Sequence, residues 1–111
     1  MEKELNINNI EEELKNISKP VIIDFFASWC GPCKMLSPVL EKISSKFGDS
    51  IEIIKIDIDE YPDIANKYEI MSVPTLMFFL NGELLRRETG FVPEEKILEM
   101  IKSDFCVSSK C

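Results

Sequence analysis

The chain has 111 residues, with 20 acidic and 13 basic side chains, four cysteines and no histidine. This length fits one domain with a single core, and the lack of histidine excludes Ser-His, Cys-His and imidazole–metal chemistry. The formal charge of -7 argues against a nucleic-acid partner, because phosphate binding needs clustered lysine and arginine.

The first half of the chain alternates between helical and extended patterns. Residues 8–18 carry apolar side chains at helical spacing and predict an amphipathic helix, with a short edge strand expected near residues 5–7. Residues 21–27 are almost continuously apolar, which is typical of a strand buried on both faces. Residues 34–47 return to a helical stripe, in which we expect Met35 to belong to the core.

The second half continues the alternation and adds a hairpin. Asn81-Gly82 lies between two extended patterns and favours a tight turn between antiparallel strands. The predicted elements are a strand at 51–58, a helix at 61–68, strands at 75–80 and 83–88, and a helix at 93–105. The chain is therefore predicted to be an α/β protein with a central mixed sheet of four to five strands, flanked by four helices on both faces.

No segment has the pattern of a membrane span or a secretory signal. The longest strictly apolar run covers residues 76–80, far below the roughly 18 residues needed to cross a bilayer. Residues 1–16 contain five glutamates and no apolar stretch. We therefore expect a cytoplasmic protein without membrane association, in which paired cysteines are catalytic, redox-sensing or metal-binding.

The segment Trp29-Cys30-Gly31-Pro32-Cys33 lies where a buried strand ends and a long helix begins. Free N–H groups and the partial positive charge at a helix start stabilise a thiolate and lower the pKa of a cysteine there. Cys30 is therefore the expected nucleophile. Cys33, three residues on, can attack Cys30 and close a disulfide, and this exchange requires no metal or other cofactor.

The sequence resembles the thioredoxin family over nearly its whole length. The family's pattern is present in the segments Asp24–Ala27, Trp29–Met35, Pro38, Lys55–Asp57, Val73–Thr75, Phe78, Asn81-Gly82 and Gly90. The resemblance implies a thioredoxin domain over residues 1–105, followed by a cysteine-containing tail at 106–111. It also implies a protein-disulfide reductase, expected to be monomeric, whose partners are disulfide-containing proteins and a thioredoxin reductase that recharges it.

The resemblance also implies roles for individual residues. Asp24 is similar to the buried aspartate that exchanges the proton of Cys33, and Lys55 to the lysine facing it on the neighbouring strand. Pro74 resembles the family's cis-proline, and the backbone of Val73 would pair with an extended substrate. The apolar docking surface would comprise Trp29, Gly31, Pro32, Val73, Pro74 and Gly90. Phe26 and Met71-Ser72 depart from the commonest family pattern, where a tryptophan and a basic residue with a small one are frequent.

Other interpretations of the cysteines remain open. Cys30 and Cys33 could form half of a zinc site completed by Cys106 and Cys111. The second pair could instead close a local disulfide, Cys111 could form intermolecular disulfides or regulate the protein, and Cys106 could be a small buried side chain. At the level of function, the alternatives to a reductase are a specialised oxidant or isomerase with the same fold and a non-enzymatic binding module.

Overall fold

The computed structural model describes residues 9–105, and these form four strands and four α-helices in the predicted alternation. The expected strand near residues 5–7 and the cysteines Cys106 and Cys111 lie outside this range. The strands are β1 (Val21–Phe26), β2 (Glu52–Asp57), β3 (Thr75–Leu80) and β4 (Glu83–Thr89). The helices are α1 (Ile10–Lys15), α2 (Gly31–Phe47), α3 (Pro62–Lys67) and α4 (Glu94–Asp104), with a 3-10 turn η2 (Gly48–Ser50) after α2.

The four strands form one mixed sheet in the order β2-β1-β3-β4. Strand β1 pairs in parallel with β2 and antiparallel with β3, and β3 pairs antiparallel with β4. The hairpin predicted at Asn81-Gly82 joins β3 to β4, and both turn residues have positive φ. The mixed α/β architecture predicted from the sequence is therefore confirmed.

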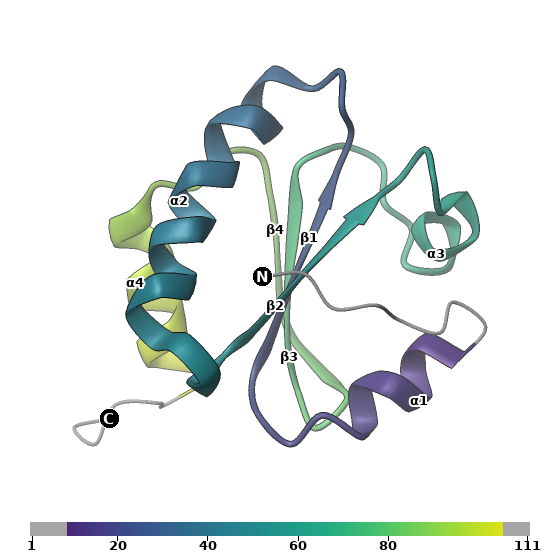
Figure 1. Cartoon of the computed structure of the whole chain (residues 1–111). Helices are drawn as coiled ribbons and strands as arrows, with labels where there is room; N and C mark the ends of the chain where they lie inside the picture. The colour runs from purple at the N-terminus through teal and green to yellow at the C-terminus, as the bar shows by residue number, and fades with distance from the viewer. Residues whose placement is uncertain (1–8, 106–111) are drawn as a thin grey trace.

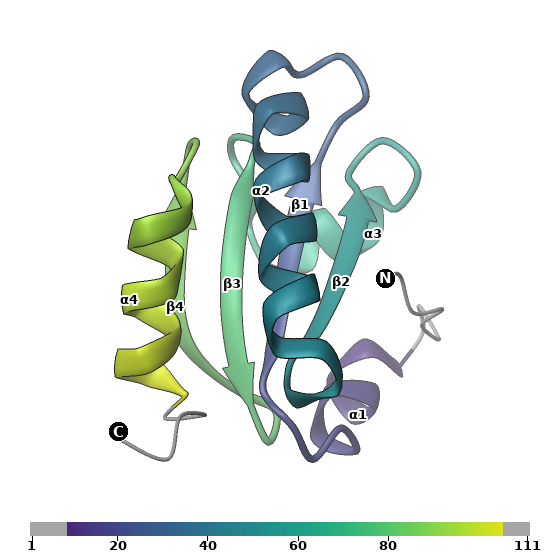
Figure 2. The ribbon, with the colours of Figure 1, turned by 60° about the vertical axis from the view of Figure 1, so that its left-hand side comes forward.

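Each face of the sheet is covered by two helices, α2 and α4 on one side and α1 and α3 on the other (Figure 1). Turning the molecule brings α2 and α4 in front of the sheet and shows the long α2 crossing it from end to end (Figure 2). Strands β1 and β3 lie in the middle of the sheet and are buried almost throughout, whereas β4 is an exposed edge. The continuous apolar runs of β1 and β3 follow from this burial on both faces.

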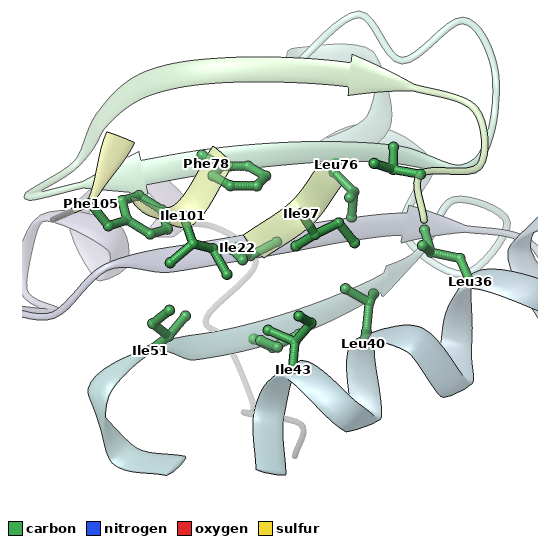
Figure 3. Packing of buried hydrophobic residues seen from close by; sticks show 12 residues of the cluster. Ile22, Leu36, Leu40, Ile43, Ile51, Leu76, Phe78, Ile97, Ile101 and Phe105 are labelled. Carbon is green, nitrogen blue, oxygen red and sulfur yellow. The ribbon is translucent and has the colours of Figure 1, made fainter. Parts of the chain in front are cut away.

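The core on the side of α2 and α4 is where the long helix is held against the sheet. Leu36, Leu40 and Ile43 of α2 point toward Ile22 of β1 and toward the apolar side chains of α4 (Figure 3). Alternate residues of a strand share one face, so Asp24, two residues after Ile22, also belongs to the side that α2 covers. This places an acidic side chain beneath the helix that begins with the cysteine pair.

Two local predictions, the length of α1 and the burial of Met35, need correction. Helix α1 covers only Ile10–Lys15, shorter than the predicted 8–18. Helix α2 begins at Gly31, within the cysteine segment as predicted, and its apolar stripe starts three residues later. Met35 is 60% exposed and does not belong to the core, since the buried face of α2 is set by Cys33, Leu36 and Leu40.

Candidate active site

Cys30 is the N-cap residue of α2, and Cys33 lies in the first turn of that helix. The two are joined by a disulfide, with their Cα atoms 5.3 Å apart. The Cys33 backbone N–H also donates a hydrogen bond to the Cys30 sulfur over 3.1 Å. Pro32 fits here because the first helical N–H groups have no intrahelical acceptor. The Cys30 sulfur therefore accepts a hydrogen bond from an N–H group and lies at the partially positive end of a 17-residue helix.

These features favour the thiolate form of Cys30 once the disulfide is reduced. A donor aimed at the sulfur and the helix dipole both stabilise negative charge, and both lower the pKa of a thiol. Both cysteines are buried, in a small apolar cluster with Ala27 and the half-buried Val73. A partner protein would therefore contact the residues around the cysteine pair in order to reach it.

The loop before β3 lies against the cysteine pair. The Val73-Pro74 peptide bond is cis, and the Val73 carbonyl oxygen is 3.6 Å from the Cys30 sulfur. In the disulfide that sulfur has no proton, so this is a contact, whereas a Cys30 thiol at the same place could donate to the carbonyl. The Pro74 carbonyl accepts a 2.8 Å hydrogen bond from the Gly90 N–H, and Gly90 has a φ of +90°. Chain segments more than forty residues apart therefore meet at one site.

Asp24 is a carboxyl placed in the middle of the sheet. Asp24 is only 1% exposed, and within residues 9–105 its Oδ1 atom has no hydrogen-bond partner. Burial raises the pKa of Asp24 to about 6, and the positive charge of Lys55 opposes part of that rise. A carboxyl with this pKa can both take up and release a proton near neutral pH.

Lys55 is the register partner of Asp24 on the parallel strand β2. Its ammonium does not end at the carboxyl. Instead it donates a 3.1 Å hydrogen bond to the Ser37 hydroxyl of α2 and lies 5.2 Å from the centroid of the Phe26 ring. The structure therefore brings the predicted pair onto neighbouring strands, and it adds Ser37, a residue that sequence reasoning missed.

Trp29 lies beside the cysteine pair with 67% of its surface exposed. Its indole Nε1 donates a 2.8 Å hydrogen bond to Asp59, whose backbone N–H in turn donates to the Asp57 carboxylate. Asp59 was also missed, although it lies only two residues past the end of β2. Because β1 and β2 are parallel, their carboxyl ends meet at one edge of the sheet, and this rule could have found it.

The exposed surface near these segments is more apolar than the sequence suggested. Gly31 and Pro32 are exposed, and Val73 and Gly90 are half-buried. Three large apolar side chains that follow or precede them closely in the chain are exposed as well. These are Met35, Met71 (92% exposed) and Phe91. Where exposed apolar side chains form one contiguous patch, they are typical of contact sites for other proteins.

The site and fold define a class of small redox proteins, and comparison with known proteins assigns the family. The thioredoxin family model matches residues 2–103. The thioredoxin of Bacillus subtilis is 47% identical over 81 residues, covering 73% of this chain and 78% of that protein. Thioredoxin Y of rice, a chloroplastic protein, is 40% identical over 101 residues, covering 91% of this chain and 60% of that protein.

The chain belongs to the thioredoxin family. It spans about three-fifths of the length of the plant relatives, including the chloroplastic thioredoxin Y2 of Arabidopsis thaliana, which is 39% identical over 105 residues. Within residues 9–105, no helix is both long and apolar enough to cross a bilayer.

Proposed function

We propose that this protein is a thiol–disulfide oxidoreductase that reduces disulfides in other proteins through a Cys30–Cys33 dithiol/disulfide cycle. The observation that carries the proposal is the disulfide at the N-terminus of α2, in contact with the loop that contains the cis Val73-Pro74 bond. The structure represents the oxidised state of this cycle. Membership of the thioredoxin family supports the same reaction.

In the first step the Cys30 thiolate attacks one sulfur of a substrate disulfide. A bond forms between Cys30 and that sulfur, the substrate S–S bond breaks, and the second substrate sulfur leaves as a thiolate that takes up a proton. The helix N-terminus supports this step because it holds Cys30 in its charged form before the attack.

In the second step Cys33 attacks the Cys30 sulfur of the mixed disulfide. For this attack Cys33 must lose its proton, and we assign that proton to the Asp24 carboxyl, which lies beneath α2 and has a pKa of about 6. The Cys30–Cys33 bond forms, the bond from Cys30 to the substrate breaks, and the substrate leaves with both sulfurs reduced. Two electrons have then passed from the protein to the substrate.

The docking surface is proposed to comprise Trp29, Gly31, Pro32, Val73 and Gly90, with Pro74 beneath it. An extended substrate segment could pair with the backbone of Val73, as a strand pairs with a sheet edge. The exposure of Trp29, Gly31 and Pro32 supports this arrangement.

A second protein must return electrons to the cycle. We propose that this partner is a thioredoxin reductase. We also propose that the protein acts in the cytoplasm, although its relatives include both bacterial and chloroplastic thioredoxins. Immunodetection in separated cell fractions tests the compartment, and enrichment in an organelle would reject the cytoplasm.

The reduction of insulin disulfides by dithiothreitol tests the reaction. The wild-type protein should accelerate it, and Cys30→Ser should abolish the acceleration. Cys33→Ser should instead accumulate a mixed disulfide that gel electrophoresis without reductant detects. Activity that persists in Cys30→Ser would reject Cys30 as the nucleophile, and a strongly oxidising reduction potential would favour an oxidant over a reductase.

A further inference from the structure

The position of the Lys55 ammonium is unexpected for a lysine beside a buried carboxyl. Asp24 and Lys55 are register partners on adjacent parallel strands, so their side chains start from the same face of the sheet. A lysine is long enough to reach its neighbour across that spacing. Nevertheless its Nζ binds the Ser37 hydroxyl, while the Asp24 Oδ1 atom has no partner within residues 9–105.

Two contacts hold the ammonium away from the carboxyl. One is the 3.1 Å hydrogen bond to Ser37, and the other is the face of the Phe26 ring, 5.2 Å from Nζ. Ser37 is half-buried on α2, one residue past Leu36, so its hydroxyl is at the rim of the face that packs on the sheet. An alanine there would offer the ammonium no acceptor.

The other groups around Asp24 leave this ammonium as the charge that matters most. Strand β3 presents Leu76 opposite Asp24, and α2 contributes the cysteine pair and Ser37. Strand β2 contributes Lys55 and, two residues further, Asp57, whose carboxylate accepts the Asp59 N–H. Lys55 is the charged group that acts on the Asp24 carboxyl, so moving its ammonium should change the proton affinity of Asp24 strongly.

We propose that Ser37 is a positioning residue that holds the Lys55 ammonium on α2 and so keeps it out of direct contact with the Asp24 carboxyl. The inference deepens the proposed function, because it concerns the carboxyl assigned to the proton of Cys33. An ammonium in direct contact with Asp24 would stabilise the carboxylate and keep it charged at lower pH. The hydroxyl thus keeps Asp24 able to bind a proton close to neutral pH.

Ser37→Ala tests this directly. The lysine loses its acceptor on α2, and the Oδ1 atom of its register partner Asp24 has no hydrogen-bond partner within residues 9–105, so the ammonium should move to Asp24. The proton affinity of Asp24 should then fall by about tenfold or more, which is the usual effect of an opposite charge within 4–6 Å. Alanine is a good helix former, and α2 should remain intact.

The measurement is the NMR titration of the Asp24 side-chain carboxyl carbon in the oxidised protein. It is made on the wild type, Ser37→Ala, Ser37→Thr, Lys55→Met and the double variant Ser37→Ala/Lys55→Met. Threonine retains the hydroxyl and should titrate like the wild type. In the Lys55→Met background, Ser37→Ala should have no further effect, because no ammonium remains to be moved.

An unchanged or raised pKa of Asp24 in Ser37→Ala would overturn the proposal. The proposal would also fail if the pKa of Asp24 were lower in the double variant than in Lys55→Met, since the hydroxyl would then act on Asp24 without Lys55. This titration needs no turnover, so its failure leaves the reductase activity measured with insulin unaffected. Conversely, loss of insulin reduction by the wild type would reject the proposed function without changing the titration.

Discussion

Two aspartates on the same side of the sheet are treated in opposite ways. Asp24 of β1 is buried, its Oδ1 has no partner within residues 9–105, and its pKa is raised. Asp104 at the end of α4 receives two hydrogen bonds from the Arg86 guanidinium of β4, over 2.6 Å and 3.2 Å. The same guanidinium also contacts Glu88, and the pKa of Arg86 is raised chiefly by its hydrogen bonding to Asp104.

The difference separates a carboxyl that holds structure from one that can exchange a proton. The ion pair of Asp104 fixes the last helix to the edge strand, where a permanently charged carboxylate serves best. Asp24 lacks such a partner, and a carboxyl that is poorly solvated keeps its proton to higher pH. Unpaired burial costs stability, and it persists here in the middle of the sheet, beneath the helix that carries the cysteine pair.

The largest effect is expected when the unpaired carboxyl is removed. Asp24→Asn cannot accept the proton of Cys33, so the release of substrate from the mixed disulfide should slow by about 100-fold or more at neutral pH. Single-turnover reduction of insulin, followed over a range of pH, measures this step.

The matched control is Asp104→Asn, which removes a carboxylate of the paired kind. It should leave the rate and its pH dependence unchanged. A rate for Asp24→Asn equal to the wild type at every pH would show that water or another group accepts the proton.

Much of the fold could be predicted from local patterns. The two buried strands appear as continuous apolar runs, and the hairpin follows from Asn81-Gly82, so β1, β3 and β4 were placed within one residue at each end. The apolar stripe alone would start α2 three residues too late, because Gly31 and Pro32 have low helix propensity, although both are tolerated in a first turn. Pattern reading detects the apolar stripe of a helix better than its first turn.

Pattern reasoning found the site only where its residues are close in the chain, and the family resemblance supplied the distant Asp24, Lys55 and Val73-Pro74. Cys30 and Cys33 are three residues apart in sequence. Ser37 and Lys55 are 18 residues apart and meet only because β2 pairs with β1 under α2. The same holds for Trp29 and Asp59, which are 30 residues apart. Hydrogen bonds between distant polar side chains depend on register and rotamer, which periodicity does not reveal.

The second effect concerns stability and again distinguishes Asp24 from Asp104. The native state binds the Asp24 proton more tightly than the unfolded state, because the pKa is about 6 against an ordinary 3.8. The contribution of Asp24 to the free energy of unfolding should therefore be most favourable below about pH 3.8. It should be lost as the pH rises through about 6. The shift corresponds to about 3 kcal/mol at pH 7.

Asp24→Asn should remove this dependence. The free energy of unfolding of Asp24→Asn minus that of the wild type should therefore rise by up to about 3 kcal/mol between acidic and neutral pH. Urea denaturation at several pH values measures it. A difference that does not vary with pH would mean that the Asp24 carboxyl has an ordinary pKa in the folded protein.

A smaller effect is expected from the paired aspartate. Arg86→Ala removes both hydrogen bonds to Asp104, and since Arg86 is partly exposed the free energy of unfolding should fall by about 1 kcal/mol. Arg86→Lys keeps the charge but loses the two-pronged geometry, so it should recover only part of that loss. An Arg86→Ala protein as stable as the wild type would show that this pair does not hold α4.

The smallest effect is expected at Arg87, which uses its charge on neutral groups. Its guanidinium donates to the carbonyl oxygens of Tyr68 and Glu69, just past the end of α3, where helix carbonyls lack intrahelical partners. Arg87→Ala should lower the free energy of unfolding by about 0.5 to 1 kcal/mol. Salt distinguishes the two arginines, because about 1 M sodium chloride weakens the attraction between two opposite charges, as in the partly buried pair of Arg86 and Asp104, more than hydrogen bonds to neutral carbonyls. The loss caused by Arg86→Ala should therefore shrink in salt while that of Arg87→Ala remains, and equal shrinkage would mean that Arg87 acts through its charge alone.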